Sequence, residues 1–378
     1  MEQVDYLIAG AGAGGLTLAY LLMASNKDTK KTLLIIDKDE KRINDRTWCF
    51  WEEGDNLFEN LVHNSWSQAK FSGSGYQETF DISPYRYKMI RGIDFYNFMK
   101  ETLLADSRVT WVKDEIQEIG LSGDVKTKSG EFKAELVFDS TFNRDKLDPV
   151  KSTTLLQHFK GYIIKTEEPA FKPNEFTYMD FTVDQEGDCR FGYVLPFDEH
   201  TALVEYTLFN DQLLDQVTYK DRLAAYIRKL GIADYEILEE EYGVIPMTDH
   251  TFEMRKSAHV INIGINGGFA KPSTGYTFLR GQKILTQLVK NLANGKDPLL
   301  DLPFQKSRFK KYDATLLHVL TAGKHTGDEV FTPMFKKNGA KAFFKFLDEE
   351  TSLKEELKIM SSTPLLHFGA AFIKSMLK

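Results

Sequence analysis

The glycine-rich stretch GAGAGG at positions 10–15 constrains the fold of this 378-residue chain more than any other feature. Before it, the apolar run at 4–9 predicts a strand, and after it residues 15–23 predict a helix. Residues 32–37, TLLIID, predict a second buried strand. The start of the chain therefore predicts a β-α-β unit with the glycines at its first turn.

The three spaced glycines and one carboxylate have separate roles in such a unit. Gly10 permits a tight turn, Gly12 lets the backbone approach a pyrophosphate, and Gly15 allows helix and strand to pack closely. The helix N-terminus adds free N–H groups and positive potential. Asp37 ends the second strand, where a carboxylate holds ribose hydroxyls, and the polar insertion SNKDTKK explains its distance from the glycines. An acidic residue there favours FAD or NAD over NADP.

Length and composition exclude several other classes of protein. A chain of this length predicts two domains or two interleaved lobes. The net charge of −7 and the lack of a basic stripe argue against a nucleic-acid partner. Two distant cysteines, Cys49 and Cys189, and eight histidines without ligand spacing predict no metal site, no disulfide framework and a reduced, cytoplasmic setting. We find no secretory signal and no apolar run long enough to span a bilayer.

The remaining chain predicts mixed strands followed by helices. Strands are expected near 109–112, at 125–140, in a hairpin at 190–209 and at 259–264, and helices at 219–230 and 275–294. After Pro303 the chain predicts helices with breaks at Gly323, Pro333, Gly339 and Pro364. The last segment, PLLHFGAAFIKSMLK, predicts a helix that packs on its own protein or contacts a membrane surface.

Glu205 is a single carboxylate within the strand-forming run ALVEYTLF. By strand alternation it shares a face with Leu203, Thr207 and Phe209, while Tyr206 points to the opposite face. Two interpretations follow from the sequence. Glu205 either faces water at an edge strand, or it is buried and stays neutral, because an unpaired buried charge is costly.

Four further stretches, together with the glycine loop, resemble the flavoprotein lycopene cyclases of carotenoid biosynthesis. They are RTWCFW at 46–51, FGYVLPFDEHTALVEYT at 191–207, GVIPM at 243–247 and INGGFAKPSTGYTF at 265–278. The C-terminal segments YDATLLHVL and PLLHFGAA are also similar. The resemblance covers nearly the whole chain in the right order.

Three positions depart from the pattern of that family. Tyr206 stands where the family often has a second acid after its catalytic glutamate, and Lys271 stands where a histidine is common before Pro272. The wider flavin-hydroxylase group has a Gly-Asp pair where this chain has Gly264 and Ile265, which favours a cyclase over a hydroxylase. The tyrosine leaves open which base removes the ring proton, with Glu205 itself as one candidate.

The resemblance implies an α/β fold with interleaved domains. A Rossmann-like FAD-binding domain of the flavin-hydroxylase type would comprise residues 1–60 and 255–300 with part of 85–145. A mixed β-sheet substrate domain would comprise 61–84 and 146–254, and residues 301–378 would form a C-terminal helical region.

The implied activity is that of a lycopene β-cyclase. It closes the ψ end groups of lycopene to β-ionone rings, giving γ- or β-carotene, by acid catalysis without net redox change. Reduced FAD is the implied cofactor, with NADPH or NADH as reductant, and Glu205 is the implied catalytic acid. Desolvation and a nearby reduced flavin would both raise the pKa of this carboxyl group. The polyene substrate implies a cytoplasmic protein held peripherally at the inner face of the cell membrane.

The resemblance also implies two sets of binding residues. The cofactor-binding residues are Gly10, Gly12, Gly15, Asp37, Arg46, Gly268, Thr274, Gly275 and Tyr276. The substrate pocket is expected to include Trp48, Phe50, Tyr193 and Phe209.

Most of these residues also have a purely structural interpretation. The aromatic residues Trp48, Phe50 and Trp51 could fill the core, and Arg46 could form a surface ion pair with Asp45 or Glu52. Gly275 could simply begin a helix. Lys271 could favour an anionic flavin, although a solvated lysine is the simpler expectation.

Two other functions are compatible with the sequence. One is an FAD- and NAD(P)H-dependent monooxygenase or reductase of another lipophilic isoprenoid. The other is a carotenoid-binding protein without catalytic activity. The sequence does not distinguish cyclisation at one end of the substrate from cyclisation at both ends.

Overall fold

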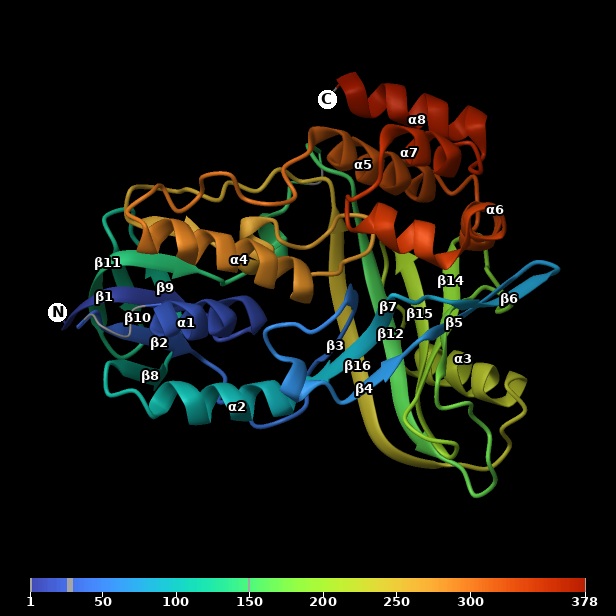
Figure 1. The fold of residues 1–378 in the computed structure, drawn as a ribbon, viewed down its shortest axis with the longest axis horizontal. Coiled ribbons are helices and arrows are strands. Elements are labelled where there is room, and N and C mark those ends of the chain that lie inside the picture. Colours follow the sequence, from blue (N-terminus) through green and yellow to red (C-terminus); the bar gives the residue numbers. More distant parts are fainter. Residues whose placement is uncertain (1, 26–29, 149, 378) are drawn as a thin grey trace.

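The fold is seen in a computed structural model that describes residues 2–25, 30–148 and 150–377. Part of the polar insertion SNKDTKK and the final Lys378 lie outside the described residues. The sheet that contains β1 lies at the left in Figure 1, and a larger sheet with long strands lies at the right. The C-terminal helices lie along one edge of the molecule, above the larger sheet in this view (Figure 1).

The first sheet is built around the predicted β-α-β unit, which is confirmed as β1 (Glu2–Ala9), α1 (Ala13–Ser25) and β2 (Leu33–Asp37). In the described residues its strand order is β8 (Val109–Lys113), β2, β1, β11 (Glu131–Asp139), β10 (Asp124–Thr127) and β9 (Ile116–Ile119), with β17 (Val260–Asn262) beside β11. Strands β8, β2, β1, β11 and β17 run parallel. Their apolar residues alternate between two cores, as Ile8 and Leu7 show, because neighbouring residues of a strand face opposite sides.

Three helices cover one face of this sheet. They are α1, α2 (Gly92–Leu104) and α4 (Phe278–Ala293), and they share one apolar core with β1 and β2. Figure 1 shows α1, α2 and α4 side by side over the strands. The parallel strands therefore point their carboxyl ends, and the glycine loop after β1, toward the larger sheet.

The larger sheet has the order β16 (Glu236–Thr248), β12 (Thr154–Lys165), β15 (Thr201–Asn210), β14 (Cys189–Pro196), β13 (Glu175–Asp180), β5 (Gln68–Gly73) and β6 (Tyr76–Asp81). A small antiparallel sheet of β3 (Thr47–Glu53), β7 (Tyr85–Arg91) and β4 (Asn64–Trp66) joins the two parts. Short 3-10 turns occur at Glu59–Leu61, Arg144–Lys146 and Gly264–Gly267.

The two faces of the larger sheet are covered by different helices. Val204, Tyr206 and Leu208 pack against α3 (Gln216–Lys229) on the outer face. Leu203 and Phe209 belong to the core on the inner face, which the C-terminal helices cover. The predicted division of the strand into two faces is therefore confirmed, and Glu205 is on the inner side.

The C-terminal region consists of α5 (Ser307–Thr321), α6 (Gly327–Leu347), α7 (Leu353–Met360) and α8 (Leu365–Leu377). The predicted breaks near Gly323, Gly339 and Pro364 are confirmed, since Gly339 has φ of 73° inside α6. The predicted break at Pro333 is wrong, because Pro333 lies inside α6. Aromatic packing on both sides offsets its missing hydrogen bond: Phe331 stacks on Phe181, and Phe335 stacks on Phe71.

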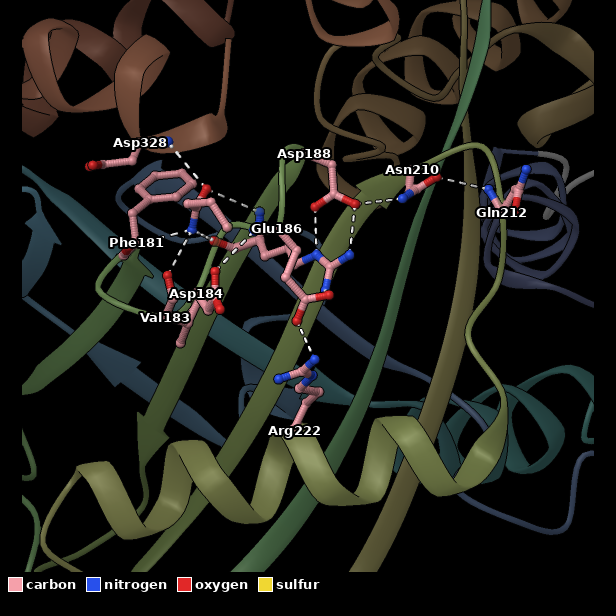
Figure 2. Close-up of polar contacts among 11 residues, drawn as sticks. Phe181, Val183, Asp184, Glu186, Asp188, Asn210, Gln212, Arg222 and Asp328 are labelled. Carbon is pink, nitrogen blue, oxygen red and sulfur yellow. Dashed lines mark hydrogen bonds and ion pairs between the residues drawn. The ribbon is translucent and has the colours of Figure 1, made fainter. Parts of the chain in front are cut away.

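A polar network fixes α6 relative to the larger sheet (Figure 2). The Arg190 guanidinium pairs with Asp188 at 2.5 Å and with Glu186 at 2.6 Å, and Asn210 donates to Asp188 at 2.6 Å. The backbone N–H of Asp328, in the first turn of α6, donates to the side chain of Gln185 at 3.4 Å. Because these groups lie on the β13–β14 connection, on β15 and on α6, the network holds the helix over the inner face of the sheet.

Candidate active site

A cavity of about 390 Å³ extends from the glycine loop to the inner face of the larger sheet. Among the predicted site residues, those that line it are Gly12, Arg46, Trp48, Tyr193, Glu205, Phe209, Thr274, Gly275 and Tyr276. Gly10, Gly15, Asp37, Phe50 and Gly268 lie outside this lining. The cavity thus brings together residues that are more than 190 positions apart in the sequence.

The glycine loop has the geometry that its spacing predicts. A Cβ atom at Gly15 would lie 2.1 Å from the carbonyl oxygen of Gly10, so only glycine permits this contact of helix and strand. At Gly12 an added Cβ would meet no atom within 4 Å, which leaves open space beside the backbone. Asp37 accepts a hydrogen bond from the backbone N–H of Ala11 at 2.6 Å and closes the end of β2 against the loop.

The second glycine-containing loop meets the first one. A Cβ at Gly14 would lie 3.2 Å from the Cα of Gly264, so the two backbones are in close contact. Helix α4 begins at Phe278, three residues later than predicted from the sequence. The reason is Gly275, whose φ of +71° is incompatible with a right-handed helix and whose N–H donates to the carbonyl of Lys271 at 2.8 Å.

The surroundings of Lys271 and Arg46 differ from those that the simplest interpretation of the sequence predicts. Lys271 is buried and its Nζ lies 3.0 Å from Asp313, so the expectation of a solvated lysine is wrong. Arg46 is exposed at the cavity and donates to the backbone oxygen of Asp45 at 2.7 Å. Within the described residues its guanidinium forms no ion pair with the carboxylate of Asp45 or Glu52.

Aromatic side chains of the RTWCFW segment divide between cavity and core. Trp48 lines the cavity and stacks on Phe278 with ring centroids 5.0 Å apart. Phe50 is buried in the core beside the sheet that contains β1, which agrees with the interpretation of this residue as core packing. Trp51 packs in the other core and meets the ring of Tyr276 edge-on at 4.8 Å.

Glu205 is buried, with 8% of its surface exposed, on a strand flanked by β12 and β14. The interpretation as a water-facing edge residue is therefore wrong. Burial raises the pKa of this carboxyl group well above its usual value, and the charge of Glu241 raises it further. The hydroxyl of Thr207, which donates to Glu205 at 3.4 Å, opposes this shift only weakly. Burial and Glu241 therefore favour the protonated, neutral form of Glu205, whose side chain faces the cavity.

Glu241 on β16 is a second carboxyl group in this cavity that sequence analysis missed. Gly161 on β12 pairs with Glu205 on one side and with Glu241 on the other. A Cβ at Gly161 would lie 2.9 Å from Cγ of Glu205 and 3.0 Å from Cγ of Glu241, so the glycine provides the space between them. The one local signal was its position two residues before the GVIPM block.

Three phenols form a hydrogen-bonded group near Glu205. The hydroxyl of Tyr87 lies 2.8 Å from that of Tyr193 and 2.8 Å from that of Tyr276. Burial raises the pKa of all three phenols well above the usual value, so they are neutral at physiological pH. Tyr193 pairs directly with Glu205 across β14 and β15. The group therefore offers π faces and hydroxyl dipoles, without a fixed charge, beside the acid.

The described residues lack two other features. In the part of the chain that the structure describes, no three His, Cys, Asp or Glu side chains are grouped so that they could hold a metal ion. Within residues 2–25, 30–148 and 150–377, no helix is both long enough and apolar enough to cross a bilayer.

Comparison with solved structures defines the class of fold. A geranylgeranyl bacteriochlorophyll reductase-like protein from Thermoplasma acidophilum superposes with a TM-score of 0.66 at 14% identity, covering 98% of each chain. The flavin-dependent brominase Bmp2 superposes with a TM-score of 0.59 at 13% identity, covering 98% of this chain and 94% of that one. The expected α/β fold of the flavin-hydroxylase type is therefore confirmed.

Sequence comparison identifies the family. The family described as "Lycopene cyclase protein" matches residues 5–371, and this chain belongs to it. Lycopene beta-cyclase of Paracoccus sp. is 28% identical over 58% of this chain and 59% of its own length, and that of Pseudescherichia vulneris is 24% identical over 80% and 77%. Neoxanthin synthase of Solanum tuberosum is 29% identical over 36% of this chain, and the match spans only 29% of that protein.

Proposed function

We propose that this protein is a lycopene β-cyclase that converts ψ end groups to β-ionone rings by acid catalysis. The observation that carries the proposal is the position of Glu205. It is a buried carboxyl group with a raised pKa that faces the same cavity as the glycine loop. Membership of the lycopene cyclase family supports the same chemistry.

The residues of the glycine loop and the second loop fit FAD. Gly12 has open space beside it, and the Gly264–Tyr276 segment faces the cavity through Thr274 and Gly275. Gln157 also lines the cavity, and its buried side-chain oxygen has no hydrogen-bond partner among the described residues. An acceptor is therefore available there for a cofactor N–H. In this proposal residues 1–60 and 255–300, with part of 85–145, hold the cofactor. Residues 61–84 and 146–254 hold the substrate, and Asp37 and Arg46 bind the ribose and phosphate groups.

Reduced flavin, when bound, supplies negative charge and π density near a developing carbocation. The chain's own residues supply the proton and exclude water. Glu205 donates its proton to the terminal double bond of the end group, which leaves a tertiary carbocation. A neighbouring double bond of the substrate then closes the six-membered ring, and loss of a ring proton restores an alkene. A positioned acid of this kind contributes about 10²–10⁴-fold to the rate.

The apolar end of the cavity suits a polyene. Phe331, Phe343 and Leu347 of α6 and Leu316 of α5 line it, together with the aromatic rings near Glu205. Faces of Tyr193 and Trp48 can stabilise a cation by on the order of 0.5–2 kcal/mol. The described neighbours of Glu205 include Gly161, Tyr193, Thr207 and Glu241, none of which is positively charged, and this is consistent with a cationic intermediate.

The decisive experiment supplies lycopene in membranes to the protein with FAD and NADPH, without air. We expect γ- and β-carotene, identified by chromatography and absorption spectra. Glu205→Gln should abolish turnover and retain the flavin, whereas Tyr206→Phe, which faces α3, should retain activity. Failure of flavin-loaded wild-type protein to cyclise lycopene would contradict the proposal.

The same assay, repeated in the presence of air, separates the two alternatives. A monooxygenase would consume oxygen together with NADPH and add one oxygen atom to its substrate, whereas a reductase would oxidise NADPH and reduce its substrate without oxygen. A carotenoid-binding protein would retain pigment, and Glu205→Gln would leave that binding unchanged.

A further inference from the structure

The Glu205–Glu241 arrangement extends the proposed function, on which this inference rests. The two residues come from strands that are not neighbours: β15 carries Glu205, β16 carries Glu241, and β12 lies between them. Register places Gly161 opposite both glutamates in one row across the three strands. Because residue 161 lacks a side chain, the two carboxyl groups can meet above the strand that separates them.

The two oxygens of the Glu241 side chain differ in their hydrogen bonding. Its Oε2 accepts a hydrogen bond from the hydroxyl of Thr47 at 2.6 Å. Its Oε1 is buried and accepts no hydrogen bond from the other described residues. Leaving a buried carboxylate oxygen unpaired costs free energy, and a protonated Glu205 is the neighbouring group that can donate to it.

Two carboxyl groups in contact inside a protein do not both ionise readily. Repulsion between like charges and loss of hydration favour a state in which the pair shares one proton. Thr47, Thr207, Tyr193 and Cys49 face the pair, and none of these four residues carries a positive charge at neutral pH. The guanidinium of Arg91 lies nearby on β7 and pairs with Glu239, two residues before Glu241 in β16. A shared proton therefore reduces the repulsion between the two carboxyl groups.

We propose that Glu241 is the second catalytic residue of this site and accepts the ring proton. Glu205 gives its proton to the substrate, which leaves two carboxylates facing one carbocation. The C–C bond then closes the ring, and Glu241 removes the proton from the ring carbon as the new double bond forms. Transfer of this proton from Glu241 to Glu205 through their hydrogen bond restores the starting state, so no proton is gained or lost. Thr47 is a positioning residue that orients the Glu241 carboxylate.

The first test compares Glu241→Gln with Glu240→Gln. Glu240 directly precedes Glu241 in β16 and forms an ion pair with Lys160 instead of facing the cavity. We expect Glu241→Gln to bind FAD and to lose about 10²–10⁴-fold in cyclisation rate. We expect Glu240→Gln to retain the wild-type rate.

The pH profile separates a catalytic pair from a structural contact. The rate requires protonated Glu205 and therefore falls as pH rises through its pKa. The charge of Glu241 raises that pKa, so removing the charge should move the alkaline limb of the residual activity to lower pH. A wild-type rate in Glu241→Gln would overturn the inference, and so would a loss of rate without this shift.

Two further variants keep the test valid if Glu241→Gln does not fold. Thr47→Val removes the donor to Glu241, and Gly161→Ala inserts a methyl group between the two side chains. Both should lower the rate while the flavin stays bound, and both should move the alkaline limb of the pH profile. An unchanged rate and profile in both variants would contradict the pair.

An infrared measurement tests the pair without turnover. We expect flavin-loaded wild-type protein to show a protonated carboxyl band at neutral pH that Glu205→Gln removes and that titrates at lower pH in Glu241→Gln. If the wild-type protein shows this band but does not cyclise lycopene, the proposed function fails while the carboxyl pair stands. If it cyclises lycopene and Glu241→Gln leaves the band and the rate unchanged, the pair alone fails.

Discussion

Lys271 and Asp313 form a buried ion pair, with 3.0 Å between nitrogen and oxygen and only 4% and 5% of the two side chains exposed. Ser273 donates to the same Asp313 carboxylate at 2.6 Å, and Glu349 lies 3.7 Å from the ammonium group. The pair joins the loop after β17 to α5. It therefore fixes the Thr274–Tyr276 segment against the C-terminal helices.

Removing one partner of this pair should strongly destabilise the protein. Lys271→Met leaves Asp313 as a buried, uncompensated charge, although Glu349 keeps its ion pair with Arg280 at 2.8 Å. We expect a loss of about 3–5 kcal/mol in the free energy of unfolding. Lys283→Met is the matched control, because Lys283 is 41% exposed and lies 3.9 Å from Glu350. That change should cost less than about 1 kcal/mol. Denaturant unfolding of both variants gives the comparison, and equal losses would contradict a special role for Lys271.

The glycine loop offers a test that separates cofactor binding from folding. Gly12→Ala places a methyl group in open space, so the cofactor-free protein should unfold at the wild-type temperature. FAD affinity should nevertheless fall by about tenfold or more, a loss of at least about 1.4 kcal/mol, because the methyl group occupies the approach of the pyrophosphate. Gly15→Ala should instead destabilise the cofactor-free protein, since its Cβ would collide with Gly10. Titration with FAD and thermal unfolding measure the two effects, and unchanged affinity in Gly12→Ala would refute this position of the cofactor.

The raised pKa of the buried Asp348 carboxyl group predicts a specific pH dependence of stability. Burial raises its pKa to about 6, although Lys283 opposes the shift, and its carboxylate accepts a hydrogen bond from the indole N–H of Trp51 at 3.0 Å. The folded state therefore holds this proton more tightly than the unfolded state, where the pKa is 3.8. Stability from this group is present below pH 4 and is lost as pH rises from about 4 to about 6.

Asp348→Asn should remove that loss. Between pH 4 and pH 7, the free energy of unfolding of the variant should rise by up to about 3 kcal/mol relative to that of the wild type, since one pKa unit corresponds to about 1.4 kcal/mol. Unfolding curves at pH 4, 5, 6 and 7 measure the difference, with Asp211→Asn at an exposed position as control. A difference between variant and wild type that is constant with pH would contradict the raised pKa.

The parts of the fold that the sequence predicts are those set by local patterns. Strand β1, the glycines and α1 follow from periodicity and turn chemistry within a short segment, and the two faces of β15 follow from simple alternation. Pro333 shows the limit of local rules, because packing of α6 against distant phenylalanines outweighs the tendency of proline to end a helix.

The candidate site is less predictable because strand order and register are not local. Glu205 is recognisable as an unusual carboxylate, but its burial depends on β12 and β14 flanking its strand. Glu241 is part of the run LEEEYGVIPM, where three consecutive acids look alike in the sequence. Only the pairing of β12 with both β15 and β16 shows which of the three acids meets Glu205. The same pairing explains why residue 161 is a glycine, since it leaves space for the two carboxyl groups.

The exposed apolar side chains of α7 and α8 predict peripheral binding to a membrane surface. Leu353, Leu357, Leu365, Leu366 and Ile373 are each more than 60% exposed, and lysines at 354, 358 and 374 lie among them. One side of α8 packs on α5 through Phe372 and Ser375, and Leu365 and Leu366 are exposed at the start of the helix. Apolar side chains flanked by lysines are typical of helices that lie in the interface of anionic bilayers.

The double variant Leu365→Ser/Leu366→Ser should therefore bind anionic vesicles about tenfold or more weakly, because burying one leucine contributes about 1.5–3 kcal/mol. The measurement is flotation with phosphatidylcholine and phosphatidylglycerol vesicles, with FAD content and unfolding temperature as checks of the fold. Leu121→Ser is the control, since Leu121 is 64% exposed at the turn between β9 and β10 of the other sheet. Cyclisation of lycopene in vesicles should fall with binding, whereas cyclisation in detergent should not. Unchanged flotation of the double variant would exclude α8 as the membrane contact.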